Sequence, residues 1–307
     1  MWRPRLVASD IDGTLLDPAD QISVRTRAAV HRVLCAGVPF VLVTGRPPRW
    51  IPPVVEQLGY AGLAVCANGA VRYDASTDRV SHAVTLEPAQ LRHAADVVAT
   101  VLPGAKLAVE LATHGAAVNG AMVNGAAQFL AEAGYTHPWP GADAVQAPRD
   151  VLLARSAIKL LVRQSNVSSD LMAVAVEELL GTRAGTPTAT RSGAPVGALS
   201  GAGSGSSWEG RAGDRLDVTY STRHGLIEIS APGVTKATGL AQLASELGVA
   251  PADVLAVGDM PNDLSMLRWA GCGVAMANAH PAVLEAADEV TTRNSEDGLA
   301  LVVERWF

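Results

Sequence analysis

The sequence is poor in aromatic side chains and in charge, and it contains no long apolar run. Only 4% of its 307 residues are aromatic and 18% are charged, whereas 49% are hydrophobic. A large aliphatic core is therefore expected, and global disorder is not. No apolar stretch reaches the ~18 residues that a membrane-spanning helix needs. With a net charge of −6 and no long basic run, neither nucleic acid nor a membrane is expected as a partner.

Cysteine is also scarce, and its spacing excludes a cysteine-based metal site. Cys35, Cys66 and Cys272 are widely separated, without a CxxC pair or a Cys/His cluster. This pattern predicts buried, reduced thiols in a cytosolic protein. No signal peptide is visible, because the opening apolar run is short and leads straight into two carboxylates. We expect a cytoplasmic protein of about two domains, either a monomer or a homodimer.

That opening run ends in two carboxylates, Asp10 and Asp12, which are followed by Gly13 and Thr14. Side chains alternate along a strand, so both carboxylates start on the same face. Ligands bind beyond the carboxyl ends of strands in open parallel sheets. Two such carboxylates suit a hard cation such as Mg²⁺, or either could act as a covalent nucleophile. An ordinary acidic turn is the alternative at this point.

The following segments predict further parallel strands that end in polar residues at the same edge. An amphipathic helix with Ser23 as its N-cap runs to Cys35, and an apolar run at 38–43 then ends at Thr44. Strand, helix and strand in this order predict a right-handed βαβ unit. Further buried strands are predicted at 63–66, 254–257, 273–275 and 289–291, with helices at 48–57 and 236–247.

The pattern changes in the middle of the chain, where we expect an inserted domain. The stretch 71–73 is predicted to start a hairpin that leaves the sheet. From about residue 84, helices at 88–101 and 169–180 alternate with strands such as 158–162, which predicts an α+β insertion over 84–231. The remaining ranges, 1–83 and 232–307, are predicted to form the α/β core. A Gly/Ser-rich stretch at 192–214 predicts a flexible surface loop, and a Pro-Gly pair at 232–233 leads back to the core.

Four motifs at these strand ends resemble those of the haloacid dehalogenase (HAD) superfamily. They are Asp-Ile-Asp-Gly-Thr-Leu at 10–15, Thr-Gly-Arg at 44–46, Lys236 after Gly-Val-Thr, and Gly-Asp-Met-Pro-Asn-Asp at 258–263. The insertion lies between the second and third motifs, as in the Cof-type subclass IIB. Asn-Gly-Ala at 68–70 and Ala-Met-Ala-Asn-Ala at 275–279 also match that subclass. The resemblance implies a Rossmann-like α/β core, a parallel sheet with helices on both faces, plus an inserted α+β cap of the C2B type.

The resemblance also implies a role for each motif residue. Asp10 would attack phosphorus to form an aspartyl-phosphate, and Asp12 would act as general acid and base. Mg²⁺ would be held by Asp10, by the backbone carbonyl of Asp12 and by Asp259. The residues implied to bind the phosphate are Thr44, Gly45, Lys236 and Asn262, and those implied to support them are Arg46 and Asp263.

The function implied is a Mg²⁺-dependent phosphatase of small phosphorylated metabolites, with sugar phosphates as the leading class. A phosphomutase of the same fold and a non-catalytic ligand-binding protein are the alternatives. Several residues also have a plainer structural interpretation. Thr44 and Asn262 could cap helices, Lys236 could be a solvated helix residue, and Arg46 could form a structural ion pair. His224 and His280 are expected to be structural. Ala237 and Gly239 depart from the usual pattern around the lysine, which affects local packing only.

Overall fold

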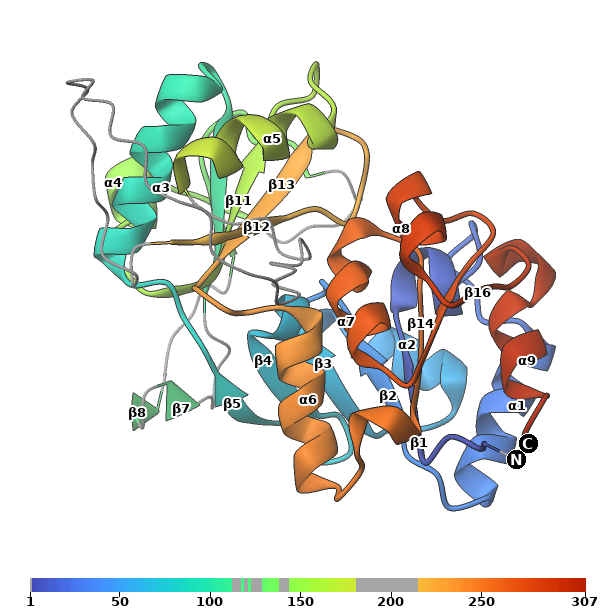
Figure 1. The fold of residues 1–307 in the computed structure, drawn as a ribbon. Coiled ribbons are helices and arrows are strands. Elements are labelled where there is room, and N and C mark those ends of the chain that lie inside the picture. Colours follow the sequence, from blue (N-terminus) through green and yellow to red (C-terminus); the bar gives the residue numbers. More distant parts are fainter. Residues whose placement is uncertain (1, 112–116, 119–120, 123–128, 138–143, 181–214) are drawn as a thin grey trace, which may run out of the picture.

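Two β-sheets organise the chain (Figure 1). The structure, a computed structural model, describes residues 2–111, 117–118, 121–122, 129–137, 144–180 and 215–307. The predicted Gly/Ser-rich loop at 192–214 lies outside the described residues. The larger sheet has ten strands in the order β16-β15-β14-β1-β2-β3-β4-β5-β7-β8, and the smaller has six in the order β10-β9-β6-β11-β13-β12.

Six strands of the larger sheet run parallel, as the sequence predicted. They are β1 (Leu6–Ser9), β2 (Phe40–Val43), β3 (Leu63–Cys66), β14 (Val254–Gly258), β15 (Cys272–Ala275) and β16 (Glu289–Val290). β1 pairs with β2 on one side and with β14 on the other. The strand order therefore reverses beside β1, which is where open α/β sheets form their ligand-binding crevice.

The predicted hairpin does not leave the sheet, so that expectation was wrong. β4 (Val71–Asp74) pairs antiparallel with β3, and β5 (Arg79–Ala83) pairs antiparallel with β4. Val71 and Tyr73 are buried whereas Arg72 is only half-buried, so the hairpin has one apolar face to cover and extends the sheet. The short strands β7 (Ala117–Val118) and β8 (Ala121–Met122) continue the same edge, although they belong to the predicted insertion.

Helices cover both faces of the parallel strands. One face carries α1 (Val24–Cys35), α2 (Pro52–Leu58) and α9 (Gly298–Val303), and the other carries α6 (Lys236–Glu246), α7 (Leu264–Trp269) and α8 (Pro281–Ala286). Val7 packs into the core of the first face, and Leu6 and Ala8 into that of the second. Consecutive side chains of a strand point to opposite faces of the sheet, and here both faces are buried. This explains the uninterrupted apolar runs in the sequence.

Local signals in the sequence account for where some of these helices start. Ser23 caps α1 as predicted, since its hydroxyl accepts a hydrogen bond from the Thr26 amide at 3.0 Å. The helix predicted at 48–57 is instead divided into a 3₁₀ turn, Pro48–Trp50, and α2. The prolines explain the division, because a proline inside a helix removes a backbone donor and restricts the residue before it.

The helices that the described residues form over the smaller sheet all lie on one face of it. Its strands are β6 (Lys106–Leu111), β9 (Phe129–Ala131), β10 (Val145–Gln146), β11 (Ala157–Arg163), β12 (Asp217–Thr219) and β13 (Leu226–Ser230). Two helices, α3 (Pro88–Val101) and α5 (Ser169–Leu180), occupy the predicted ranges and pack on the outer face; α4 (Arg149–Leu152) is short. The inner face is turned toward the larger sheet (Figure 1).

Charged side chains lie on that inner face between apolar residues of their strands. Glu110 on β6, Lys159 on β11 and Glu228 on β13 are each at most 3% exposed. Glu110 and Lys159 are register partners, and Leu161, two residues after Lys159, is the partner of Glu228. Because side chains alternate along a strand, all three charged groups share the face opposite α3 and α5.

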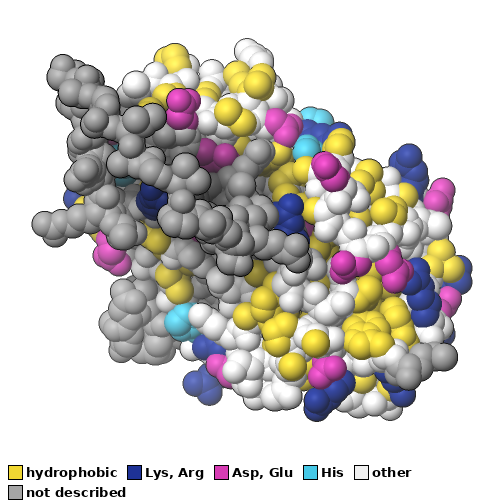
Figure 2. Space-filling view, viewed as in Figure 1, with side chains coloured by type: hydrophobic (Ala, Val, Ile, Leu, Met, Phe, Trp, Pro, Cys, Tyr) yellow, Lys and Arg dark blue, Asp and Glu magenta, His cyan; other side chains and the backbone are white. Residues whose placement is uncertain are grey.

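Two further expectations concern the surface and the thiols. Cys66 is buried and Cys272 half-buried, but Cys35 at the end of α1 is exposed, so the prediction of three buried thiols was wrong for Cys35. Acidic and basic side chains are interspersed over the described surface seen in Figure 2. None of the helices formed by the described residues is both long and apolar enough to cross a membrane.

Candidate active site

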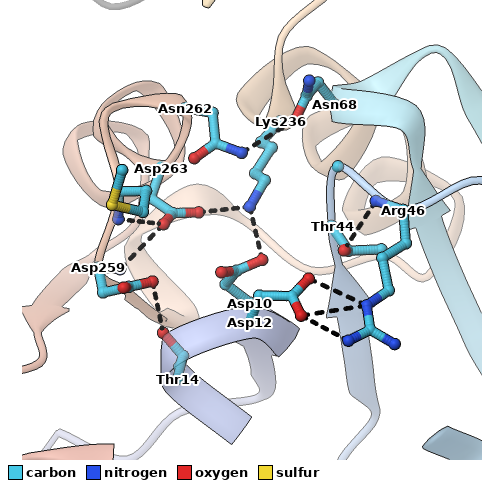
Figure 3. Close-up of polar contacts among 12 residues, drawn as sticks. Asp10, Asp12, Thr14, Thr44, Arg46, Asn68, Lys236, Asp259, Asn262 and Asp263 are labelled. Atoms are coloured by element: carbon cyan, nitrogen blue, oxygen red, sulfur yellow. Dashed lines mark hydrogen bonds and ion pairs between the residues drawn. The ribbon is translucent and has the colours of Figure 1, made fainter. Parts of the chain in front are cut away.

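The polar residues predicted from the four motifs come together at the carboxyl ends of three neighbouring strands (Figure 3). Asp10 follows β1, Thr44 follows β2 and Asp259 follows β14. Lys236 begins α6, and its helix is capped by Thr235, whose hydroxyl accepts a hydrogen bond from the Thr238 amide at 3.1 Å. Residues more than 200 positions apart thus share one site because the strand order reverses beside β1.

Lys236 is the centre of this arrangement. Its Nζ donates to Asp10 Oδ1 at 2.7 Å and to Asp263 Oδ1 at 2.6 Å, and its side chain is 0% exposed. The two carboxylates raise the pKa of the Lys236 ammonium against the opposing effect of burial, so the group is charged. The alternative that Lys236 is a solvated helix residue is therefore excluded.

Asp263 is committed to holding Lys236 and the loop after β14. Its second oxygen, Oδ2, accepts the backbone N–H groups of Asp259 and Met260, each at 2.9 Å. Both oxygens of this buried carboxylate therefore already have protein partners. Asp263 is better suited to positioning Lys236 than to holding a cation.

Asp259 lies directly over Gly13, which explains why a glycine stands at that turn. A Cβ at position 13 would come within 2.2 Å of Asp259 Oδ2, and Gly13 has a φ of +78°. The Thr14 hydroxyl donates to the other Asp259 oxygen at 3.3 Å. The turn after β1 thus brings Asp10 and Asp259 together.

The buried carboxylates carry more negative charge than the one ammonium can neutralise. Asp10, Asp259 and Asp263 each place an oxygen within 4.8 Å of the others. Burial, followed by the charge of Asp263, raises the pKa of Asp10 to about 7 even though Lys236 opposes the shift. Burial and the charge of Asp10 raise the pKa of Asp259 well above its usual range. An oxygen-only donor set with excess negative charge fits a divalent hard cation such as Mg²⁺.

Asp12 has a different neighbour from Asp10. Both of its carboxylate oxygens accept from the Arg46 guanidinium, with Nε 3.0 Å from Oδ2 and Nη2 2.5 Å from Oδ1 (Figure 3). Of the two interpretations of Arg46, an ion pair is the one observed. The Asp12 side chain is still 32% exposed and lines the cavity described below, so it remains accessible to a ligand.

Thr44 and Asn262 do not cap helices through their side chains. The Thr44 hydroxyl accepts from the Arg46 amide at 3.0 Å, which leaves its own hydrogen for another acceptor. Asn262 Nδ2 donates to Asn68 Oδ1 at 3.0 Å, while Asn262 Oδ1 has no hydrogen-bond partner among the described residues. Both side chains are almost completely buried.

A cavity of about 260 Å³ lies between this site and the inner face of the smaller sheet. Predicted residues on its wall are Asp10, Asp12, Gly45, Arg46 and Asn262. Facing residues from the smaller sheet are Glu110, Phe129, Lys159, Leu161 and Glu228. Thr44, Lys236, Asp259 and Asp263 are buried close to the first group.

Sequence reasoning missed the polar contacts that cross the cavity. Arg49 forms an ion pair with Glu110, and Lys159 Nζ donates to Glu228 and to the Gly45 carbonyl, both at 2.8 Å. The available signal in the sequence was a charged residue with apolar residues on both sides of it in a strand.

His280 has the structural role that was expected, capping α8. Its Nδ1 accepts from the Ala282 amide at 3.2 Å, and its Nε2 lies 3.2 Å from Asp170 in the other half of the molecule. Neither His280 nor His224 lines the cavity. The contact between His280 and Asp170 therefore adds to the polar contacts that join the two halves of the structure.

Known proteins resemble the chain over almost its whole length. The family model described as haloacid dehalogenase-like hydrolase matches residues 7–194 and 209–303. Phosphatase YwpJ of Bacillus subtilis (strain 168) is 28% identical over 303 residues, which are 96% of this chain and 97% of that protein.

Solved structures of similar shape are also found. Phosphatase BT1666 from Bacteroides thetaiotaomicron has a TM-score of 0.70 at 20% identity, covering 99% of this chain and 95% of that one. The HAD subclass IIB sugar phosphatase BT4131 has a TM-score of 0.71 at 18% identity, covering 98% of both chains. At these identities the structures establish the fold alone: a HAD core with an inserted α+β cap.

Proposed function

Because this chain belongs to the haloacid dehalogenase-like hydrolases, we propose that it is a Mg²⁺-dependent phosphatase of small phosphorylated metabolites. Sugar phosphates are the leading substrate class. The observation that carries the proposal is the buried contact of Lys236 with Asp10, beside the carboxylate of Asp259. An anionic nucleophile can approach a phosphate dianion only where positive charge surrounds both groups.

The side chains divide the work in the following way. Asp10 attacks phosphorus in line and becomes the aspartyl-phosphate, while the ester oxygen leaves. Asp12, on the wall of the cavity, protonates that oxygen and later takes a proton from the attacking water. Lys236, Thr44, Asn262 and the Gly45 backbone contact the oxygens of the transferring group. Arg46 holds Asp12, and Asp263 holds Lys236.

The donor set suits a bound Mg²⁺. Asp10 and Asp259 would hold the ion, with the backbone carbonyl of Asp12 as the third protein ligand. When bound, the ion supplies positive charge to the phosphate oxygens and to the nucleophile. The raised pKa values of Asp10 and Asp259 support this assignment, because burial and, after it, the charges of neighbouring carboxylates disfavour the ionised forms, and a bound cation would offset both effects.

The smaller sheet covers the side of the cavity where the leaving group would lie. We propose residues 1–83 and 232–307 as the catalytic core and 84–231 as the cap. Both acidic and basic groups of the cap face the cavity, and Phe129 and Leu161 add apolar surface, a mixture that suits a hydroxyl-bearing carbon skeleton. BT4131, which shares the fold, is described as a sugar phosphatase. The cytoplasmic location and the monomeric or dimeric state stay predictions.

Phosphate release from p-nitrophenyl phosphate, with Mg²⁺ and then with excess EDTA, tests the proposal. We expect release that depends on Mg²⁺, followed by a preference for sugar phosphates in a panel of natural esters. Isomerisation of a hexose phosphate without release of phosphate would instead identify a phosphomutase. Absence of both reactions, with ligand binding intact, would identify a binding protein.

A further inference from the structure

Four buried side chains form a continuous hydrogen-bonded chain from the smaller sheet to the phosphate site. Lys159 Nζ donates to Glu228 Oε1 at 2.8 Å, and Asn68 Nδ2 donates to Glu228 Oε2. Asn262 Nδ2 in turn donates to Asn68 Oδ1 at 3.0 Å. Lys159 and Glu228 belong to the proposed cap, whereas Asn68 and Asn262 belong to the core. None of the four is more than 5% exposed.

The charge at one end of this chain determines the direction of every hydrogen bond in it. An ionised carboxylate only accepts hydrogen bonds, so Glu228 requires Asn68 to present its NH₂ group. The side-chain carbonyl of Asn68 must then face Asn262, so Asn262 must donate to it with its own side-chain NH₂ group. The direction comes at a cost, because Asn262 Oδ1 is buried without a partner among the described residues. The opposite orientation of Asn262 would place two carbonyl oxygens against each other.

The backbone around Asn68 holds this arrangement in place. Asn68 has a φ of +55° and Ala67 one of +49°, a left-handed conformation that is unfavourable for alanine. The backbone N–H of Asn68 donates to the backbone carbonyl of Thr44 at 2.9 Å, which connects the turn to the phosphate-site loop. Strained residues persist where the surroundings determine their position, and they gather at functional sites.

Gly45 gives the chain its close approach to the phosphate-site backbone. A Cβ at position 45 would lie 3.2 Å from Asn68 Oδ1, 3.6 Å from Glu228 Oε2 and 3.8 Å from Asn262 Nδ2. Three members of the chain therefore converge over one glycine. Lys159 Nζ also donates to the carbonyl of that glycine at 2.8 Å.

We propose that Glu228 is a positioning residue that acts through Asn68 to turn the NH₂ group of Asn262 toward the transferring phosphate. The second hydrogen of Asn262 Nδ2 has no partner among the described residues and is available to a phosphate oxygen. Since Glu228 lies on β13 of the cap, full phosphate affinity requires the cap to rest on the core. The inference depends on the proposed function, because it assigns Asn262 to the phosphate.

Glu228→Gln tests the direction of the chain with almost no change in shape. The ammonium of Lys159 attracts the only oxygen of the new amide, so the NH₂ group of that amide faces Asn68. Asn68 and Asn262 must then both reverse, and the Asn262 carbonyl swings toward the phosphate. We expect the inhibition constant of inorganic phosphate to rise at least tenfold, which is about the effect of one hydrogen bond to a charged group.

A second substitution restores the direction and makes the test specific. In Glu228→Gln with Asn68→Asp, the carboxylate has moved one position along the chain and again only accepts. It receives the new amide introduced by Glu228→Gln on one side and Asn262 Nδ2 on the other, at unchanged net charge. The double variant should recover most of the phosphate affinity, whereas Asn68→Asp alone places two carboxylates together and should not.

The Asn262→Ala background shows whether the effect passes through Asn262. There, Glu228→Gln should change the phosphate inhibition constant by less than twofold. Glu132→Gln, which neutralises a cap carboxylate paired with Arg149 away from the cavity, is the matched control and should leave the constant unchanged. Asn68→Gly removes the middle of the chain while keeping the pair of Lys159 and Glu228, and it tolerates the positive φ. Asn68→Gly should lose phosphate affinity as Glu228→Gln does, and it keeps the test valid if Glu228→Gln folds poorly.

The possible results separate the two claims. An unchanged inhibition constant in folded Glu228→Gln and Asn68→Gly, or an equal loss in the Asn262→Ala background, overturns the positioning role alone. A wild-type chain that neither hydrolyses p-nitrophenyl phosphate nor binds inorganic phosphate overturns the proposed function, and the positioning role with it. Thermal unfolding of each variant distinguishes loss of affinity from loss of fold.

Discussion

The ammonium of Lys236 lies 2.7 Å from a carboxylate oxygen of Asp10, although 226 positions separate the two residues. This contact joins the first and third motifs in the interior, where both side chains are almost completely buried. A second carboxylate, that of Asp263, lies 2.6 Å from the same ammonium. The stability of the fold and the reactivity of the site therefore both depend on the ammonium of Lys236.

Lys236→Met should abolish activity and also destabilise the fold. Removing one partner from a buried ion pair leaves the other charge uncompensated, at a cost of about 3–5 kcal/mol. Urea unfolding measures the loss. Adding Asp263→Asn removes one of the stranded charges and should recover part of the stability but none of the activity. Full activity in Lys236→Met would contradict the phosphate-site assignment.

Asp10→Asn should reduce turnover by several orders of magnitude while the protein stays folded. The amide keeps the shape of the carboxylate but cannot act as the attacking anion. Steady-state phosphate release and circular dichroism together test this expectation. Near-full activity in a folded Asp10→Asn would rule out the covalent mechanism.

Arg46 should act on the reaction through Asp12. Lysine at position 46 keeps the charge but loses the bidentate contact with both Asp12 oxygens. We expect Arg46→Lys to lower kcat less than Asp12→Asn, and to have little further effect when added to Asp12→Asn. Additive effects in this double-mutant cycle would show that Arg46 contacts the substrate independently.

Asp217 should make stability depend on pH between about 4 and 6. Burial raises the pKa of Asp217 to about 6 from 3.8, although the amides of Gly233 and Val234 oppose the shift. The folded state thus holds this proton more tightly than the unfolded state, so the stabilisation is present below pH 3.8 and lost as pH rises through 6. Asp217→Asn stays neutral throughout. Its Tm minus that of the wild type should be more positive at about pH 7 than at about pH 5, and a smaller difference at the higher pH would refute the assignment.

Deletion of residues 195–208 should leave activity nearly unchanged. The family model matches the chain on both sides of this stretch and not within it, and most residues of the stretch are glycine, alanine or serine. A substrate panel run on the deletion and on the full chain measures any change in kcat/KM. Loss of all activity would show that these residues contribute to the cavity.

The strand ends could be predicted from the sequence because each carries its polar residue within a few positions of an apolar run. Asp10, Thr44 and Asp259 are local features of this kind, and parallel strands bring them to one edge. The cap residues could not be placed in the same way. The partners of Glu228 are set by how two sheets pack, and no spacing in the sequence encodes that packing. Even so, a lysine at 159 and a glutamate at 228 inside apolar strands are unfavourable to bury, which marks them for a polar partner.

The hairpin and Arg46 show two other limits. The stretch 71–73 has the alternation of a half-covered strand, but whether it joins or leaves a sheet depends on the pairing edge of β3. Arg46 could pair with Asp12 or with a ligand, and no local pattern distinguished the two. Both outcomes depend on contacts between segments, which local patterns do not determine.

Trp2 and Trp306 meet edge to face with ring centroids 5.2 Å apart, so the chain begins beside the place where it ends (Figure 1). Arg3 adds a contact over the ring of Phe307. A circular permutant could join these ends by a short linker and have its new ends within residues 195–208. In its sequence the two ranges of the proposed core, 232–307 and then 1–83, would follow each other without interruption. The cap thus divides the proposed core only in the order of the sequence. In the folded structure the strands of both core ranges belong to one sheet.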